Sequence, residues 1–90
     1  MRLRWTRAGS QDLESVEQYI SRDNPDAASE IIRRVEILPE HPGMGRPGRV
    51  EGTRELVVGS LPYVLPYVHQ GDTIIVLRLL HGAMRWPESC

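Results

Sequence analysis

The sequence gathers cations in one short stretch. Three arginines, Arg46, Arg49 and Arg54, lie within nine residues, and the first two stand among glycines and prolines that prevent a helix. A guanidinium group is a planar fork that binds phosphate or carboxylate through two hydrogen bonds. We therefore expect this stretch to contact an anion, which could belong to a nucleic acid, an acidic peptide or the protein itself. Solvated loop arginines without a partner are the alternative.

A histidine near the end of the chain allows a different chemistry. A histidine can act as a general acid or base near neutral pH, and arginines can stabilise a developing negative charge. His81, Arg78 and Arg85 could form such a site, with Glu55 as the base. We favour simpler roles: an ion pair between Glu55 and Arg78 across two strands, and a hydrogen-bonded structural histidine. An arginine in an apolar strand needs such a partner because an unpaired buried charge is costly.

Aromatic residues are a second kind of candidate contact. Tyr63 and Trp86 are candidates for binding a partner or a nucleic acid, although Trp86 and Trp5 more often pack against the protein than stack on bases. Tyr63 and Tyr67 would share one face of a regular strand, and Pro66 between them could break that relation through a bulge.

The composition is that of one small globular domain spanning residues 1–90. The chain has a formal net charge of −1, no lysine and 40% hydrophobic residues. The only cysteine is Cys90, which excludes an internal disulfide and a Cys/His zinc site, so we expect no metal or cofactor. No apolar run is long enough for a membrane span or a signal peptide, and we expect a cytoplasmic protein.

The charges are unevenly distributed. Residues 1–10 carry three arginines and no acid, whereas residues 11–40 carry eight acids and three arginines. A protein that bound DNA by bulk electrostatics would usually be basic overall. We therefore expect recognition of the target by a local surface.

Two helices are expected in the first half of the chain. Residues 10–22 and 25–39 both place apolar residues at three- and four-residue steps. Asn24 is a suitable cap for the second helix, Pro25 its first residue and Pro39 its end. The expected apolar faces are Leu13, Val16, Tyr19 and Ile20 in the first helix and Ala28, Ile31, Ile32, Val35 and Leu38 in the second. Helices this short need a sheet to pack against.

The remaining segments predict strands. Residues 2–6 alternate polar and apolar, with Leu3 and Trp5 on the buried face. Residues 53–58, 63–68 and 73–80 are separated by turns and form an antiparallel meander. The predicted fold is α+β: a small antiparallel sheet, made of the N-terminal strand and the meander, packed by a two-helix hairpin.

This order of elements, together with several motifs, closely resembles the RelE/ParE superfamily of toxins from bacterial type II toxin–antitoxin modules, often called plasmid-stabilisation proteins. The resemblance covers nearly the whole chain. It implies an α+β fold with the helical hairpin on one face of the sheet. The motifs are Asp23-Asn24-Pro25-Asp26-Ala27-Ala28, Gly45-Arg46-Pro47-Gly48-Arg49-Val50-x-Gly52-Thr53-Arg54-Glu55-Leu56, Pro62-Tyr63-Val64-x-Pro66-Tyr67 and Leu77-Arg78-x-Leu80-His81-Gly82.

The resemblance implies two possible targets. RelE-like members cleave mRNA in the ribosome, ParE-like members poison DNA gyrase, and a cognate antitoxin neutralises either kind by wrapping a partly disordered segment around it. Such a toxin and antitoxin could form a hetero-oligomer. For Arg46 and Arg49 we favour a carboxylate of the antitoxin over a nucleic-acid phosphate.

The chain departs from the ribonuclease pattern. Val64 stands where RelE-like enzymes carry an arginine, and the preceding strand offers Arg54 and Glu55 in place of lysines. We therefore expect a ParE-like inhibitor of an essential target, DNA gyrase. The first alternative is a ribosome-dependent mRNA endoribonuclease that uses His81, Arg54, Arg78 and Arg85. The second is a degenerate member that only binds antitoxin, because its second helix is one to two turns shorter than is usual in relatives.

Overall fold

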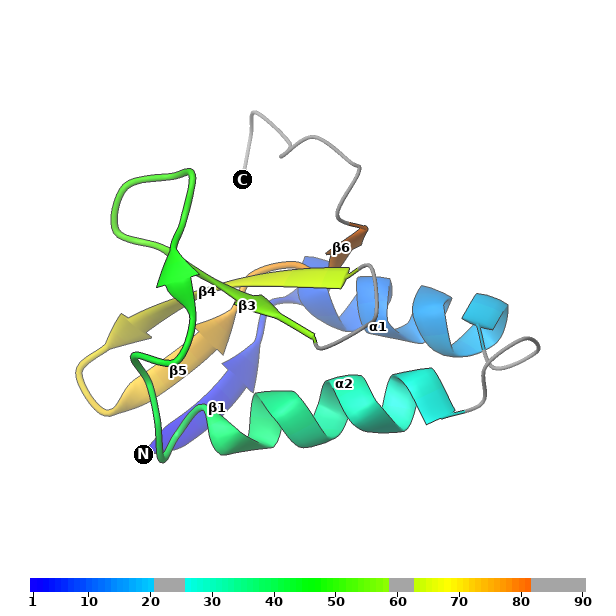
Figure 1. Ribbon diagram of the computed structural model, residues 1–90, viewed down its shortest axis with the longest axis horizontal. Helices are drawn as coiled ribbons and strands as arrows, with labels where there is room; N and C mark the ends of the chain where they lie inside the picture. Colours follow the sequence, from blue (N-terminus) through cyan, green and yellow to red (C-terminus); the bar gives the residue numbers. More distant parts are fainter. Residues whose placement is uncertain (21–25, 59–62, 82–90) are drawn as a thin grey trace.

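The computed structural model describes residues 1–20, 26–58 and 63–81, and within these ranges two helices cover one face of a six-stranded sheet (Figure 1). The predicted α+β class is confirmed. Along the chain the elements are β1 (Arg2–Trp5), α1 (Arg7–Ile20), α2 (Asp26–Ile37), β2 (Arg46–Pro47), β3 (Arg54–Val57), β4 (Tyr63–Gln70), β5 (Thr73–Val76) and β6 (Leu80–His81).

The sheet is mixed, which corrects the expectation of a wholly antiparallel sheet. Its strand order is β1-β5-β4-β3-β2, with β6 paired to β4. The meander β3–β4–β5 is antiparallel as predicted, but β1 runs parallel to β5, from Arg2 opposite Thr73 to Trp5 opposite Val76. β1 and β5 end together at Trp5 and Val76, and the chain turns into α1 directly after β1.

Thr6 makes that junction and also starts α1. Its amide donates to the Val76 carbonyl (3.0 Å), and its hydroxyl donates to the Leu77 carbonyl (2.6 Å). The same hydroxyl oxygen accepts a hydrogen bond from the Gly9 amide (3.0 Å), which is the geometry of an N-terminal helix cap. The helix therefore begins at Arg7, three residues before the predicted start. The predicted cap of α2, Asn24, and Pro25 lie outside the described residues.

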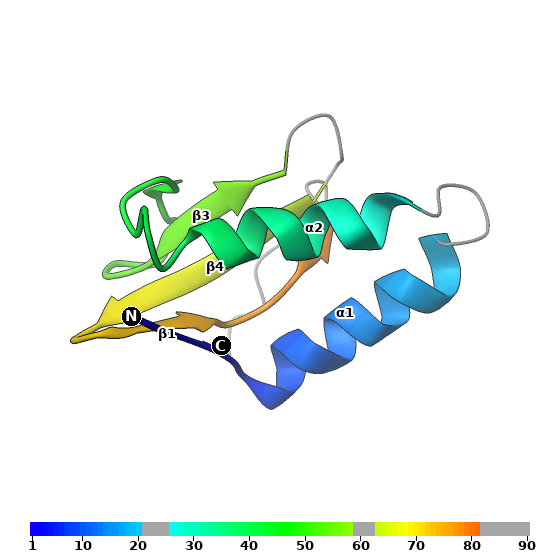
Figure 2. The same cartoon turned by 90° about the horizontal axis from the view of Figure 1, so that it is seen from below.

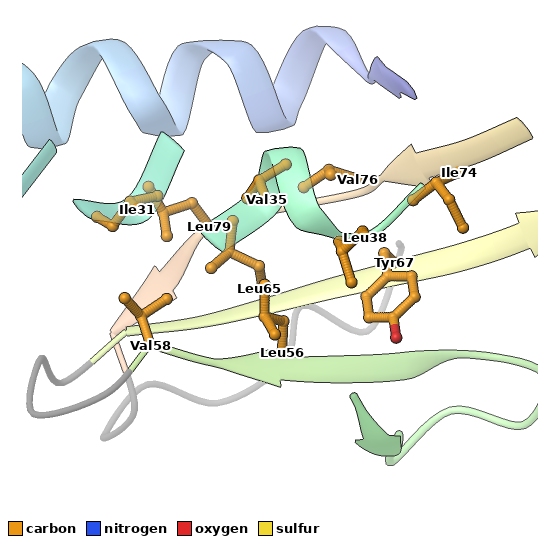
Figure 3. Close-up of a cluster of buried hydrophobic side chains, with 10 residues drawn as sticks. All are labelled: Ile31, Val35, Leu38, Leu56, Val58, Leu65, Tyr67, Ile74, Val76 and Leu79. Atoms are coloured by element: carbon orange, nitrogen blue, oxygen red, sulfur yellow. The ribbon is translucent and has the colours of Figure 1, made fainter. Parts of the chain in front are cut away.

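The hydrophobic core lies between the helices and the sheet. Figure 3 shows Ile31 and Val35 of α2, and Leu38 directly after it, facing side chains of the sheet. Figure 2 shows α1 beside α2 on this same face, with Leu13 and Val16 packed against the core from its edge. The sheet contributes Leu56, Val58, Leu65, Tyr67, Ile74, Val76 and Leu79.

Two residues of the predicted apolar faces lie elsewhere. Tyr19 is 81% exposed, because it is offset from Leu13 around the helix and belongs to the last turn of α1. In α2, Ala27 is buried and Ala28 only partly so.

A one-residue bulge separates β5 from β6. Tyr67 of β4 is opposite Val76, and Val64 is opposite Leu80, so two residues of β4 face the three residues 77–79. The extra residue shifts the alternation of side chains along this segment. Ile74 and Val76 enter the core before the bulge and Leu79 enters it afterwards.

Pro66 lies opposite this bulge, which explains why a proline is tolerated inside the longest strand. Its carbonyl accepts a hydrogen bond from the Leu77 amide (2.8 Å), so its nitrogen also faces the interrupted ladder rather than β3. The missing donor therefore costs no bond to β3. The predicted bulge exists, but the extra residue is in the partner segment.

Candidate partner-binding site

The arginine-rich stretch forms a small hairpin at the edge of the sheet. Arg46 of β2 is opposite Glu55 of β3, and Pro47 is opposite Arg54. The Gly48 amide donates to the Thr53 carbonyl (2.9 Å) and closes the loop. A side chain at position 48 would collide with the Thr53 hydroxyl, so glycine is required there. The arginine-rich stretch is thus a hydrogen-bonded hairpin rather than a solvated loop.

A buried carboxylate organises this hairpin. Glu55 is 2% exposed, and its Oε1 accepts hydrogen bonds from Nε (3.4 Å) and Nη2 (3.2 Å) of Arg46. Its Oε2 accepts a hydrogen bond from the backbone amide of Arg49 (3.0 Å). The favoured ion pair between Glu55 and Arg78 is therefore wrong. Arg46 and the loop backbone satisfy Glu55, because β4 separates β3 from the segment that carries Arg78.

The three arginines of the stretch do not converge on one anion. Arg46 shares its face of the sheet with Glu55, whereas the adjacent Arg54 is on the face of the core residues Leu56 and Tyr67. Nη1 of Arg54 donates to the carbonyl of Gly45 (2.8 Å). Arg49 contributes its backbone amide to Glu55, and its exposed guanidinium has no hydrogen-bond partner within the described part of the chain. Of the three arginines, Arg49 is the one whose guanidinium group remains available to bind an anion of a partner.

The Tyr67 side chain fixes the loop that leads into the hairpin. Its hydroxyl donates to the Pro42 carbonyl (2.7 Å) and accepts a hydrogen bond from the Gly45 amide (2.9 Å). The ring is fully buried, so the loop at residues 42–45 is fixed by a side chain of the central strand. From the sequence, Tyr67 is recognisable only as a strand residue, and neither its type nor its spacing indicates this contact.

Arg78 is fixed by a helix rather than by the hairpin. Its Nε donates to Oδ2 of Asp12 in α1 (2.7 Å), and its Nη2 donates to Oδ1 (3.2 Å). The Leu79 amide donates to the same Oδ2 (3.0 Å), so Asp12 ties α1 to the bulge between β5 and β6. This contact of Asp12 was not predicted, because carboxylates are common near helix starts and its partner lies 66 residues away.

The other predicted site residues are dispersed. The backbone of His81 in β6 lies opposite Tyr63, whereas Arg54 lies opposite Tyr67, four residues further along β4. Tyr63 is partly buried and packs against the core. Arg85 and Trp86 lie outside the described residues. In the described ranges the ribonuclease candidates therefore come from separate elements, and their arginines bind separate parts of the protein.

The two hairpin arginines are predicted to differ in their effect on stability. Arg46→Ala removes two hydrogen bonds and one cation from the buried Glu55 carboxylate, and we expect the free energy of unfolding to fall by about 1–3 kcal/mol. Arg49→Ala keeps the backbone amide that binds Glu55, and we expect a change within about 0.5 kcal/mol. Urea denaturation followed by far-UV circular dichroism measures both. Equal effects of the two substitutions would contradict the assigned roles.

The described residues contain neither a metal-binding cluster nor a membrane-spanning helix. Residues 1–20, 26–58 and 63–81 contain no group of three or more histidine, cysteine, aspartate or glutamate side chains placed to hold a metal ion. In the same ranges, neither helix has the length and apolarity needed to cross a membrane.

Comparison with known proteins finds similarity to toxins over nearly the whole chain. Residues 3–86 match the family model described as the ParE toxin of the type II toxin–antitoxin system parDE. Y4kP of Sinorhizobium fredii, a candidate toxin by its name, is 40% identical over 91 residues, which cover 97% of this chain and 94% of that protein.

Solved structures are also similar to this chain over most of its length. A chain of the chromosomal ParDE system of Pseudomonas aeruginosa has a TM-score of 0.79 and 28% identity, covering 90% of this chain and 95% of that one. A chain of the toxin–antitoxin complex RelBE2 of Mycobacterium tuberculosis has a TM-score of 0.68 and 24% identity, covering 89% and 95%. The second similarity concerns the fold alone.

Proposed function

Because this chain belongs to the ParE toxin family of type II toxin–antitoxin systems, as its motifs indicated, we propose that it inhibits DNA gyrase and is neutralised by a cognate antitoxin. The observation that favours an inhibitor over a ribonuclease is the commitment of two candidate catalytic arginines to structural contacts. Arg54 donates to a loop carbonyl, and Arg78 is paired with Asp12.

A ribonuclease would need the guanidinium groups of Arg54 and Arg78 at the phosphate that it cleaves. Guanidinium groups that stabilise a phosphorane must converge on one phosphate-sized site. Arg78 binds Asp12 through two of its nitrogens, which neutralises much of its charge. Turning it toward RNA would break both hydrogen bonds to Asp12 and leave that carboxylate without its cation. This cost supports binding and blocking as the mode of action.

The face of the sheet away from the helices also supports a binding role. Val57 of β3 is opposite Val64 of β4, which is opposite Leu80 of β6. Their neighbours Leu56 and Leu65 point into the core, so this apolar row points away from the helices. Val57 is 40% exposed and Val64 partly exposed, whereas Leu80 is buried. The accessible valines with a cationic hairpin beside them suit a protein surface better than a phosphate.

The antitoxin is proposed as the partner of the hairpin. The matched family model and one similar solved structure are both described as parts of ParDE systems, which supports a paired antitoxin for this chain. Arg49 offers an exposed guanidinium on a hairpin held by Glu55, and a carboxylate of the antitoxin would match it. This function places the toxin in the cytoplasm with its target and predicts a toxin–antitoxin hetero-oligomer.

Two parallel reactions test the target. We expect purified toxin to inhibit gyrase supercoiling and to trap linearised plasmid, while a ribosome-bound message stays intact. Added antitoxin should reverse the inhibition. His81→Ala is the matched control, and it should inhibit gyrase as the wild-type protein does.

The other outcomes each select an alternative. Message cleavage with normal supercoiling, abolished in His81→Ala, would replace the proposal with the ribosome-dependent endoribonuclease. An inert but folded protein that still binds antitoxin would support the degenerate member, for which the 12-residue α2 is the structural reason.

A further inference from the structure

The two layers of the protein carry opposite charge. In the described residues the six strands contain four arginines and one acid, whereas the two helices contain three arginines and six acids. The acid of the strands is Glu55, which is buried and bound by Arg46. Because both helices cover the same face of the sheet (Figure 2), the opposite or outer face is the less acidic side of the molecule. An anionic partner would therefore approach the outer face.

Two exposed cations of the outer face lie on β1. Leu3 and Trp5 are half-buried and pack against the core on the helix side, whereas Arg2 and Arg4 are exposed on the outer face. Within the described part of the chain, neither of these guanidinium groups takes part in an ion pair or a hydrogen bond. Residues two apart in a strand are about 6.6 Å apart along its axis. The two charges can therefore contact successive anionic groups of one polymer.

The surface beside these two arginines is uncharged along the neighbouring strands. One acid is close, Asp72 in the turn before β5. Its carbonyl accepts a hydrogen bond from the Arg2 amide (2.7 Å), and its carboxylate accepts one from the Thr73 hydroxyl (3.2 Å) rather than from Arg2. The residues that continue the rows of Arg2 and Arg4 across β5 and β4 are Thr73, Ile75, Gln70 and Val68.

We propose that Arg2 and Arg4 bind phosphates of the DNA duplex that gyrase holds, so that the toxin contacts both components of the gyrase–DNA complex. The inference rests on the gyrase inhibition proposed above. The accessible valines, Val57 and Val64, would face the gyrase protein. β1 is three strands from β3, about 14 Å across the sheet, and would face the DNA.

A nucleic-acid backbone fits this surface better than an acidic protein segment does. Phosphate oxygens are commonly bound by arginine together with neutral side chains such as glutamine, and Gln70 is exposed on the same face. A duplex carries one phosphate for about every 1.7 Å of its axis, so two cations on one strand meet anions in any register. Carboxylates of a protein would have to be matched to each arginine. The acidic helices would repel the same duplex, so only the outer face can approach it.

Linearisation of plasmid by gyrase in the presence of the toxin tests the contact. We expect Arg2→Gln/Arg4→Gln to raise the toxin concentration that gives half-maximal linear plasmid at least about tenfold. The Kd for gyrase without DNA should change less than about twofold. Each phosphate contact contributes about 0.9 to the slope of log affinity against log salt concentration, so the double substitution should reduce the magnitude of that slope by about 1.8. The melting temperature should stay nearly unchanged, since both side chains are exposed.

Two further variants have different expected results. Arg33→Gln removes an exposed arginine from α2 in the helical layer, and it should change the half-maximal concentration less than about twofold. Asp72→Asn removes the acid beside Arg2, and it should lower the half-maximal concentration by roughly twofold, because the local potential becomes more positive.

The outcomes separate this inference from the proposed function. A wild-type toxin that inhibits gyrase, with an equally potent double variant, would remove the DNA contact and leave the proposed function standing. Weaker binding of the double variant to gyrase without DNA would assign the two arginines to the protein instead. Loss of antitoxin affinity with unchanged linearisation would assign them to the antitoxin. A wild-type toxin that does not inhibit gyrase would remove the proposed function and this inference with it.

Discussion

We expect Gly45→Ala to lower the free energy of unfolding by about 1–3 kcal/mol, the usual cost of overpacking a close contact. A Cβ at this position would lie 2.7 Å from both Cε1 and Oη of Tyr67 and 2.9 Å from the Glu55 carbonyl. The Tyr67 ring is fully buried and cannot move aside. The loop must move instead, and it then loses the hydrogen bonds of the Tyr67 hydroxyl to Gly45 and Pro42.

The neighbouring glycine supplies the control for this prediction. A Cβ at Gly43 would meet nothing within 4 Å, and its φ is not positive. Gly43→Ala should therefore change stability by less than about 0.5 kcal/mol. Urea denaturation followed by far-UV circular dichroism compares the two. If both substitutions cost the same, the close approach of the loop to Tyr67 is not what holds the hairpin.

The same substitution should also affect partner binding. Gly45 directly precedes β2, and β2 carries the arginine that binds Glu55. Displacing the loop therefore disturbs the hairpin on which Arg49 is presented. We expect Gly45→Ala to weaken antitoxin binding more than Gly43→Ala does.

Local patterns predicted the elements whose partners are close in the sequence. The meander follows from three apolar runs separated by short turns, and α2 follows from Ile31, Val35 and Leu38 on one face. These signals are local, because hairpin pairing and helical periodicity both act between near neighbours. The motif set also indicated the correct superfamily.

The contacts that build the candidate site could not be predicted in this way. Asp12 and Arg78 are 66 residues apart, and Gly45 and Tyr67 are 22 apart. Whether such side chains meet depends on the order and register of the strands, which apolar periodicity does not specify. The interpretation of Glu55 and Arg78 as a pair failed for this reason: both residue types were suitable, but the intervening β4 and the bulge at residues 77–79 assign them different partners.

The pair of Asp12 and Arg78 should be among the strongest polar determinants of stability. Asp12→Ala removes three hydrogen bonds at once, those to Nε and Nη2 of Arg78 and that to the Leu79 amide. Breaking a buried ion pair costs about 3–5 kcal/mol. Because the two side chains keep 26% and 20% of their exposure, water screens part of this loss, and we expect about 2–3 kcal/mol.

A double-mutant cycle separates the two contacts of Asp12. Arg78→Met removes the ion pair but leaves the carboxylate to bind the Leu79 amide, so we expect it to cost less than Asp12→Ala. The coupling energy between the two substitutions should be at least about 1 kcal/mol, as for other residues in one hydrogen-bonded network. Glu14→Ala, two residues along α1 and exposed, is the control and should be nearly neutral. Additive effects of Asp12→Ala and Arg78→Met would mean that Asp12 acts only through the backbone. Arg78 would then be held less firmly than the geometry indicates, and the argument against its use in RNA cleavage would weaken with it.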